Sequence, residues 1–371
     1  MPTFSTRLRP RRCLLALGAW LLALTAQAST GLMVLPAPPG GGPVTLVYPS
    51  ASPAQTVQRM ARDFTLAQDG VPQRGNGRLV VLSHGSGGSP WPQFDLAQAL
   101  VSAGFTVAMP EHAGDNWHDM SKVGPESWTL RPREVSQAID AVAADPRLAP
   151  LQLAPQRVGL YGMSAGGIAA LTLAGARWSP ALWARHCDAH MRDDFAACAG
   201  LVTTLTGGLL DGAKVGLARA AIRARFAGDA EWRHWHDPRI TAVVAAVPMA
   251  TPIDLGSVMP PRVPLGLVRA GRDAWLAPRF HIDAVHAACA SSRLPDGAPG
   301  CTLVADMPQG GHGATLSPQP IGLSPPAASL LNDPPGFDRA GTLPSVYAAI
   351  VRFFQDQLGA APAAPASPAA R

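Results

Sequence analysis

The chain has 371 residues, of which 47% are hydrophobic and 15% charged, so it can bury one large core and is neither fibrous nor wholly disordered. Its formal charge is +5, but the first 28 residues contain four arginines and no acidic residue, which leaves +1 for the rest. This balance, together with the lack of a basic cluster or a stacked-aromatic RNA motif, predicts no nucleic-acid partner.

The first 28 residues match the pattern of a secretory signal peptide. Basic residues between positions 7 and 12 precede the apolar run CLLALGAWLLAL, and Ala26-Gln27-Ala28 provides small residues before a cleavage site. We therefore expect a periplasmic or secreted mature chain that begins near Ser29 and keeps no stable membrane span. A transmembrane anchor is the alternative, but the run is shorter than the roughly 20 apolar residues that cross a bilayer.

Strand-like and helix-like segments alternate after this leader. Short runs rich in Val, Leu and Ala predict strands, because strands buried on both faces of a parallel sheet are continuously apolar. Strands are expected at residues 42–50, 78–83, 105–110, 157–162, 240–248, 264–271 and 301–307, and helices at 95–103, 131–144, 165–174, 281–290 and 346–358. The alternation predicts an α/β fold with a mostly parallel central sheet flanked by helices. The Ala- and Pro-rich residues 360–371 predict a disordered tail.

One connection is too long for an ordinary crossover. Residues 177–239, called the insertion below, separate the helix at 165–174 from the next strand, whereas most connections span about 2–6 residues. The insertion contains helix-like pieces and four tryptophans, Trp178, Trp183, Trp232 and Trp235. Either these tryptophans form a small core of their own, or the insertion is a cap that turns apolar surface toward a ligand.

Four cysteines follow the expected cleavage site: Cys187, Cys198, Cys289 and Cys301. An even number in an exported chain is expected to form disulfides. Three connectivities are possible, and we favour Cys187 with Cys198 and Cys289 with Cys301, which close two local loops. Zinc is the alternative for Cys187, since His186 and His190 lie nearby, but neither C-x-x-C nor H-E-x-x-H accompanies them. We expect no metal.

A glycine-bracketed serine lies between two predicted elements. Residues 162–166, GMSAG, match G-x-S-x-G and join a strand-like run to a helix-like run, the context that this motif requires. At such a sharp turn the hydroxyl of Ser164 projects from the sheet edge, and side chains at Gly162 and Gly166 would collide with their surroundings. The next residue begins the helix, so the N–H of Ala165 can donate to a developing oxyanion. The motif predicts Ser164 as a nucleophile; a merely small residue in a turn is the alternative.

A glycine-rich loop, residues 84–89, follows the strand expected at 78–83. The motif places a second oxyanion donor after an earlier strand, and the N–H of Ser86 is our candidate. A dinucleotide-binding loop is the alternative, but Pro90 stands where G-x-G-x-x-G needs its last glycine. His84 is expected to order this loop by hydrogen bonding rather than to act as a base.

An activated serine needs a base, and the base needs a carboxylate that fixes its tautomer. Folds with this motif carry the three in the chain order serine, acid, histidine. Asp273 follows one predicted strand and His312 follows the next, so we expect these two side chains to complete a triad with Ser164. Structural roles in loops are the alternatives for both. Asp254 is the rival acid, and His286, in a predicted helix body, is the weaker rival base.

These motifs resemble those of a known superfamily. The segments VTLVYPS, LVVLSHGSGG, LRPREVSQAIDAV, VGLYGMSAGG, DPRITAVVAAVP, RAGRDAWLAP and GGHGA span most of residues 42–315. They are similar to the α/β-hydrolases of the bacterial group called predicted dienelactone hydrolases, which resemble platelet-activating-factor acetylhydrolases. The resemblance implies an α/β-hydrolase domain over residues 29–359 with a helical cap at 177–239. It also implies Ser164 as nucleophile, His312 as base, Asp273 as acid, and the N–H groups of Ala165 and Ser86 as the oxyanion hole.

Two departures from the resemblance limit what it implies. True dienelactone hydrolases use a cysteine as nucleophile, so Ser164 argues against that substrate. In the acetylhydrolases the acid follows an earlier strand, and the matching place here is near Pro248, so their acid is not carried over.

The combined motifs predict an exported serine hydrolase that cleaves carboxylic esters through an acyl-enzyme and needs no cofactor. The expected substrate is a small-molecule or lipid-like ester. A peptidase or amidase on the same scaffold is one alternative, although neither a partner domain nor an amine-binding acidic cluster is evident. A non-catalytic binding protein is the other, and the complete order of serine, acid and base argues against it.

Overall fold

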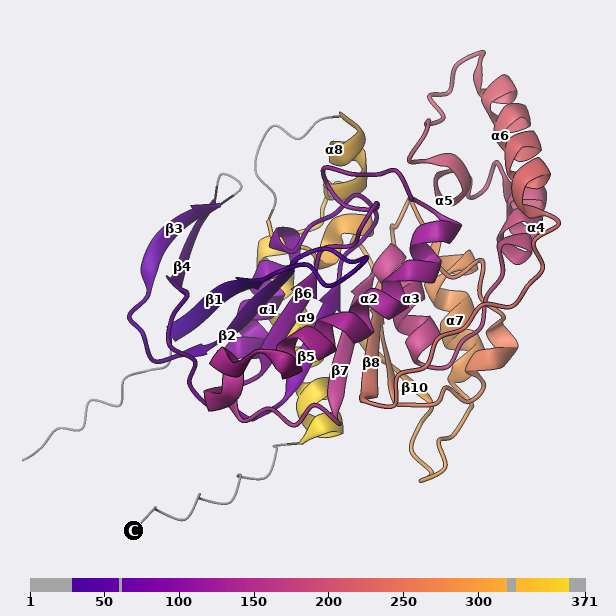
Figure 1. The fold of residues 1–371 in the computed structure, drawn as a ribbon. Coiled ribbons are helices and arrows are strands. Elements are labelled where there is room, and N and C mark those ends of the chain that lie inside the picture. The colour runs from indigo at the N-terminus through magenta and orange to yellow at the C-terminus, as the bar shows by residue number, and fades with distance from the viewer. Residues whose placement is uncertain (1–28, 60–61, 319–324, 360–371) are drawn as a thin grey trace, which may run out of the picture.

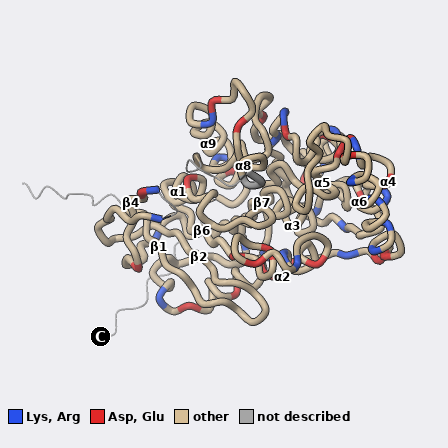
Figure 2. Tube along the Cα trace, turned by 90° about the horizontal axis from the view of Figure 1, so that it is seen from above, with Lys and Arg blue, Asp and Glu red and all other residues tan. Residues whose placement is uncertain are grey.

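A computed structural model describes residues 29–59, 62–318 and 325–359 (Figure 1). The expected signal peptide at 1–28 and the expected tail at 360–371 lie outside the described residues. Figure 2 shows lysine and arginine mixed with aspartate and glutamate along the trace. In the described ranges no helix has both the length and the apolar character needed to cross a bilayer.

A ten-stranded, mostly parallel sheet forms the centre of the molecule, in the order β10-β9-β8-β7-β5-β6-β2-β1-β4-β3. Its strands are β1 (Ser29–Leu35), β2 (Val44–Ser50), β3 (Gln55–Arg59), β4 (Arg62–Gln68), β5 (Leu79–Ser83), β6 (Thr106–Pro110), β7 (Val158–Met163), β8 (Ile240–Ala246), β9 (Leu265–Ala270) and β10 (Cys301–Met307). The six strands β10, β9, β8, β7, β5 and β6 run parallel to one another, whereas β2 pairs with β6 in the antiparallel direction. The α/β class and the largely parallel sheet are therefore confirmed.

Helices cover both faces of this sheet. The helices of the described residues are α1 (Phe94–Ser102), α2 (Pro125–Ala144), α3 (Ala165–Leu173), α4 (Pro180–His190), α5 (Phe195–Ala199), α6 (Asp211–Phe226), α7 (Ile282–Cys289), α8 (Pro325–Leu331) and α9 (Arg339–Leu358). The apolar sides of α1 and α9 pack on one face, and those of α2, α3 and α7 on the other. Because β5 and β7 are buried on both faces, their sequences are continuously apolar.

Several elements differ from the expectation. Strands β1, β3 and β4 were not expected; β3 lies at the sheet edge and most of its residues are exposed, so it lacks a strong apolar pattern. Helix α2 begins at Pro125 rather than 131, and α9 begins at Arg339 rather than 346. Both contain an internal proline, Pro132 and Pro344, which usually marks a helix start because it lacks an N–H. Here tertiary packing continues the helix across it.

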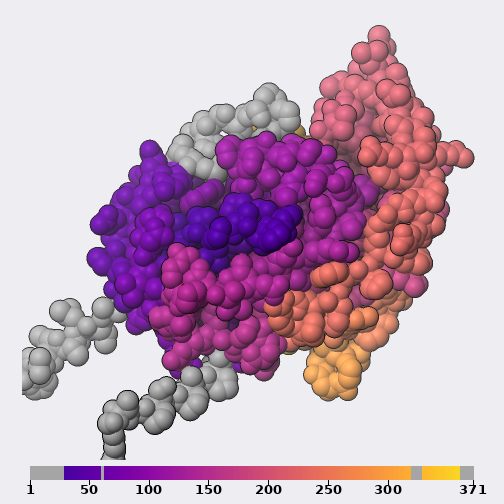
Figure 3. Space-filling model, viewed as in Figure 1, coloured from indigo at the N-terminus to yellow at the C-terminus, as the bar shows by residue number. Residues whose placement is uncertain are grey.

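The insertion carries α4, α5 and α6 and rises at one end of the molecule (Figures 1 and 3). A β-bridge between Trp178 and Arg233 joins the two ends of the insertion, and a second β-bridge from Trp178 to Ile253 joins it to the body. Both favoured disulfides are present. One joins Cys187 to Cys198 within the insertion, and the other joins Cys289 to Cys301. The sulfur of Cys187 is therefore not available as a zinc thiolate, which removes the alternative interpretation.

Candidate active site

Ser164 occupies a sharp turn between β7 and α3. Its backbone has φ 58° and ψ −116°, a left-handed conformation that only a tight turn imposes on a residue with a side chain. A Cβ at Gly162 would lie 2.0 Å from the carbonyl oxygen of Gly166, and a Cβ at Gly166 would lie 2.0 Å from that of Ser83. The two glycines are thus required because backbone fills the space that their side chains would need.

His312 joins Ser164 to Asp273. His312 Nε2 lies 2.9 Å from Ser164 Oγ, and His312 Nδ1 lies 2.7 Å from Asp273 Oδ2. The imidazole and the carboxylate are buried, while Ser164 is partly exposed. With Nδ1–H donating to the carboxylate, Nε2 is left to accept the serine proton. The structure therefore brings together the three residues expected from the sequence, each just beyond the end of a parallel strand.

The rival acid and base lie elsewhere. Asp254 accepts a hydrogen bond from Arg177 Nε at 2.8 Å and from the N–H of Gly256. His286 lies within α7, as its periodicity indicated. Neither residue contacts Ser164, so the geometry favours Asp273 and His312.

The two candidate oxyanion donors, the backbone N–H groups of Ser86 and Ala165, flank Ser164. Within the described residues, those of Ser86 and Ala165 donate to no protein acceptor. A Cβ at Gly85 would lie 3.3 Å from Ser164 Cβ, so the glycine-rich loop passes directly beside the serine. Small residues allow this approach, and the two donors can serve an oxyanion at this position.

A buried ion pair holds the glycine-rich loop. Arg131 Nη2 lies 2.8 Å from Asp115 Oδ2, and both side chains are fully buried. Asp115 Oδ1 accepts from the N–H of Gly87 at 2.9 Å, and Oδ2 accepts from Ser86 Oγ at 3.0 Å. Arg131 also donates to the carbonyl of His84. Burial alone would raise the pKa of Asp115, but Arg131 and the other donors outweigh it and lower the pKa to about 2.

His84 and His112 also hold the glycine-rich loop through hydrogen bonds. His84 Nδ1 lies 2.7 Å from the carbonyl oxygen of Gly85, and His84 Nε2 accepts from the N–H of His112. His112 in turn lies 2.7 Å from Ser83 Oγ and contacts Glu134. Burial, reinforced by Arg131, holds the pKa of both imidazoles well below the usual value, which favours their neutral forms. His84 therefore orders the loop, as expected.

A cavity of about 910 Å³ opens above Ser164 and His312. It is mostly apolar, and it is lined by the glycine-rich loop, the segment before α2, the insertion and α8. Its large apolar side chains include Trp117, Met120, Met163, Trp183, Val202, Phe226, Trp275 and Leu331. Among these, Trp117 is 63% and Val202 90% exposed, so the rim presents apolar side chains to solvent.

The tryptophans of the insertion do not form a separate core. Trp178 and Trp183 pack edge-on against Trp128 of α2, with ring centroids 5.7 and 5.3 Å apart. Trp235 Nε1 donates to Ser136, also on α2, whereas Trp232 is partly exposed. These tryptophans attach the insertion to the body, and Trp183 also lines the cavity.

Two site features were not recognised from the sequence. Asp115 follows β6 at the same sheet edge as Ser164, so its position after a buried strand was an available signal. Asp194, which lies in the insertion and contacts the segment after Asp273, carried no pattern of its own.

In comparisons with known proteins, neither a family model nor a curated protein sequence matches the chain. Within the described residues, no group of three or more His, Cys, Asp or Glu side chains is arranged to hold a metal ion.

Proposed function

We propose that this protein is an exported serine hydrolase that cleaves carboxylic esters through an acyl-enzyme. The observation that carries the proposal is the hydrogen-bonded chain from Ser164 through His312 to Asp273, which opens into an apolar cavity. A serine hydroxyl is a weak nucleophile until a base takes its proton, and a carboxylate must fix the tautomer of that base. The distances support both requirements.

The reaction proceeds in two steps. Ser164 Oγ attacks the ester carbonyl carbon while His312 Nε2 takes its proton, and the N–H groups of Ser86 and Ala165 stabilise the tetrahedral oxyanion. His312 then donates the proton to the departing alcohol, which leaves the acyl group on Ser164. Water attacks this acyl carbon with His312 again as base, so the carboxylic acid departs and the serine is restored. Asp273 accepts from the Nδ1–H of His312 throughout, whether the ring is the neutral imidazole or the imidazolium.

The cavity supports a substrate with a substantial apolar part. Its volume of about 910 Å³ is at the upper end for small-molecule sites, and its large side chains are apolar. We propose a small-molecule or lipid-like ester, with the insertion as a cap over its apolar group. No step requires a cofactor.

The proposal includes a fold family and a location. The parallel strands from β6 to β10, the elbow after β7 and the strand-end positions of the acid and base support an α/β-hydrolase fold related to the predicted dienelactone hydrolases. Two disulfides support an oxidising compartment such as the periplasm or the exterior.

Fluorophosphonate labelling tests the proposal directly. The mature protein and its Ser164→Ala variant would be treated with a fluorophosphonate and analysed by intact-mass spectrometry. Unlabelled samples of both would be assayed on p-nitrophenyl esters of increasing chain length and on the matched anilides. We expect one adduct on wild type, none on the variant, and ester turnover that exceeds anilide turnover. Absence of an adduct and of turnover would refute a serine hydrolase, and preferential anilide cleavage would indicate an amidase instead.

A further inference from the structure

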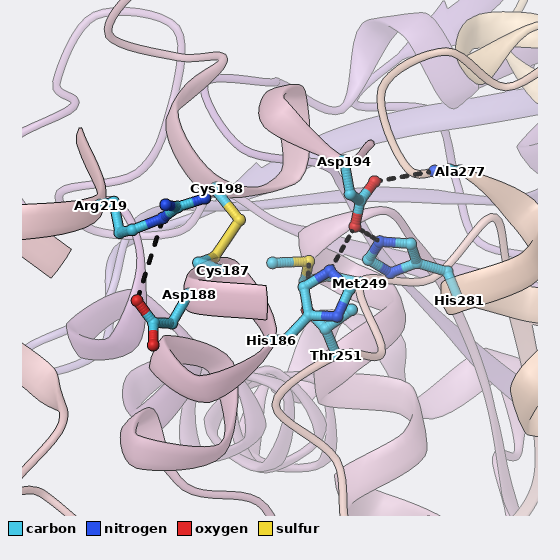
Figure 4. The surroundings of a disulfide bond; sticks show 10 residues. All are labelled: His186, Cys187, Asp188, Asp194, Cys198, Arg219, Met249, Thr251, Ala277 and His281. Carbon is cyan, nitrogen blue, oxygen red and sulfur yellow. Dashed lines mark hydrogen bonds and ion pairs between the residues drawn. A yellow bond between two sulfur atoms is a disulfide. The ribbon is translucent and has the colours of Figure 1, made fainter. Parts of the chain in front are cut away.

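A buried carboxylate in the insertion connects it to the body near the proposed acid. Asp194 lies between α4 and α5, and both of its oxygens are occupied (Figure 4). Oδ2 lies 2.8 Å from His186 Nε2 and 2.9 Å from His281 Nε2, while Oδ1 accepts from the N–H of Ala277 at 3.2 Å. His186 belongs to the insertion, whereas the other two partners belong to the body.

Asp194 and Asp273 hold the two ends of one short segment. Residues 273–277, called the acid segment here, begin with the proposed acid. Asp273 Oδ1 accepts from the N–H groups of Trp275 and Leu276, both at 2.8 Å, and Asp194 accepts from the next N–H along the chain. This segment has no regular secondary structure, so carboxylate hydrogen bonds fix its backbone.

His281 extends the connection to the backbone beneath Ser164. Its Nδ1 accepts from the N–H of Ala250 at 3.0 Å, so its proton must be on Nε2, where it faces Asp194. The preceding residue, Met249, donates its N–H to the carbonyl of Ser164 at 3.0 Å. One carboxylate thus restrains the acid segment directly and the serine turn through one imidazole.

We propose that Asp194 is a positioning residue of the active site, which acts by holding the acid segment so that Asp273 keeps its contact with His312. This inference rests on the proposed function. It assigns to the insertion a role in assembling the triad, in addition to lining the cavity.

The network requires a carboxylate rather than any polar group of this shape. All three partners of Asp194 present N–H donors, and an ionised carboxylate offers only acceptors. An asparagine that turned its NH₂ toward His186 and His281 would set it against two donors, and one that turned its NH₂ toward Ala277 would set it against the backbone N–H of the acid segment. His281 cannot relieve the conflict by moving its proton, because its Nδ1 already faces a donor.

The insertion holds Asp194 in place for this role. The Cys187–Cys198 disulfide closes the loop that carries Asp194, and His186 stands beside the first cysteine (Figure 4). Burial works to raise the pKa of Asp194, but the hydrogen bonds from His186 and His281 outweigh it, so the net shift is downward and the carboxylate stays ionised.

The test compares Asp194→Asn with Asp193→Asn. Asp193 is adjacent, its side chain is 59% exposed, and its nearest ion-pair partner, Arg279, lies 3.8 Å away. Two quantities would be measured for each variant and wild type: hydrogen exchange in peptides that contain Ala250 and Ala277, and the rate constant of fluorophosphonate labelling. The labelling endpoint counts folded sites, whereas the rate constant reports activation of Ser164, so partial unfolding is separated from misplacement.

We expect faster exchange of both peptides and labelling about 10- to 100-fold slower in Asp194→Asn, because a displacement near 1 Å in a catalytic group can cost about 10²-fold. Asp193→Asn should match wild type in both. Unchanged exchange in Asp194→Asn, or faster exchange with an unchanged labelling rate, would overturn the positioning role while the proposed function stands. A wild-type protein that is never labelled would overturn both.

Discussion

The close approach of α3 to β5 makes a quantitative prediction at Gly166. A methyl group there would lie 2.0 Å from the carbonyl oxygen of Ser83, whereas real Cβ atoms essentially never come within 3.0 Å of another heavy atom. In Gly166→Ala the start of α3 and the end of β5 must therefore separate by about 1 Å. Since β5 is hydrogen-bonded to β6 and β7 on its two sides, the movement falls mainly on the helix start, which carries the N–H of Ala165.

Two opposing energies set the stability of this variant. Alanine is favoured over glycine in a helix by about 1 kcal/mol, whereas overpacking against backbone costs up to about 3 kcal/mol. We expect Gly166→Ala to be less stable than wild type by about 2 kcal/mol and to react with a fluorophosphonate about 100-fold more slowly.

The matched control is Gly216→Ala. Gly216 is exposed within α6, and a Cβ there would meet no atom within 4 Å. The same change should therefore stabilise the protein by up to about 1 kcal/mol and leave labelling unchanged. Urea unfolding and labelling rates measure both effects. If Gly166→Ala were as stable and as reactive as Gly216→Ala, the argument that backbone contact positions Ser164 would be wrong.

Three other substitutions, one of them with a matched control, test the site. Asp273→Asn should lower kcat about 10⁴-fold, while Asp254→Asn should leave it unchanged, and ester hydrolysis measures both. Asp115→Asn should cost about 3–5 kcal/mol at pH 5, because it leaves Arg131 buried without its partner. The pKa of Asp115 is lowered from 3.8 to about 2, so its ionised form contributes fully to the free energy of unfolding above pH 3.8. This contribution is lost as the pH falls from 3.8 toward 2. Urea unfolding should therefore show the stability difference between wild type and Asp115→Asn narrowing over this pH range. Trp183→Leu should enlarge the cavity and move the optimum of a p-nitrophenyl ester series to longer acyl chains.

The central sheet and the candidate triad could be predicted because both leave local signals. A strand buried on both faces is a short apolar run, and the residues after such runs meet at one edge of a parallel sheet. Ser164, Asp273 and His312 each follow a run of this kind, so their meeting could be inferred without knowing any contact. The pairing of Cys187 with Cys198 was favoured on loop length alone.

The elements that escaped prediction depend on distant contacts. The edge strand β3 is exposed and mostly polar, so only its pairing with β4 defines it. Asp194 meets His281 across 87 residues, and nothing near either residue indicates the contact. The starts of α2 and α9 were expected too late, because Pro132 and Pro344 interrupt the local helix pattern and only packing on the sheet carries the helix across them.

Buried carboxylates recur around this site for a physical reason. The glycine-rich loop and the acid segment must bring backbone close to a substrate, and the residues of the loop are too small to be fixed by side-chain packing. Asp115 fixes the glycine-rich loop by accepting hydrogen bonds from a backbone N–H and a hydroxyl group of that loop. Asp273 and Asp194 fix the acid segment by accepting hydrogen bonds from three consecutive backbone N–H groups. Each carboxylate accepts at least three hydrogen bonds from protein donors. Loops held in this way keep their N–H groups oriented before substrate arrives, which is the condition under which an oxyanion hole contributes most to the rate.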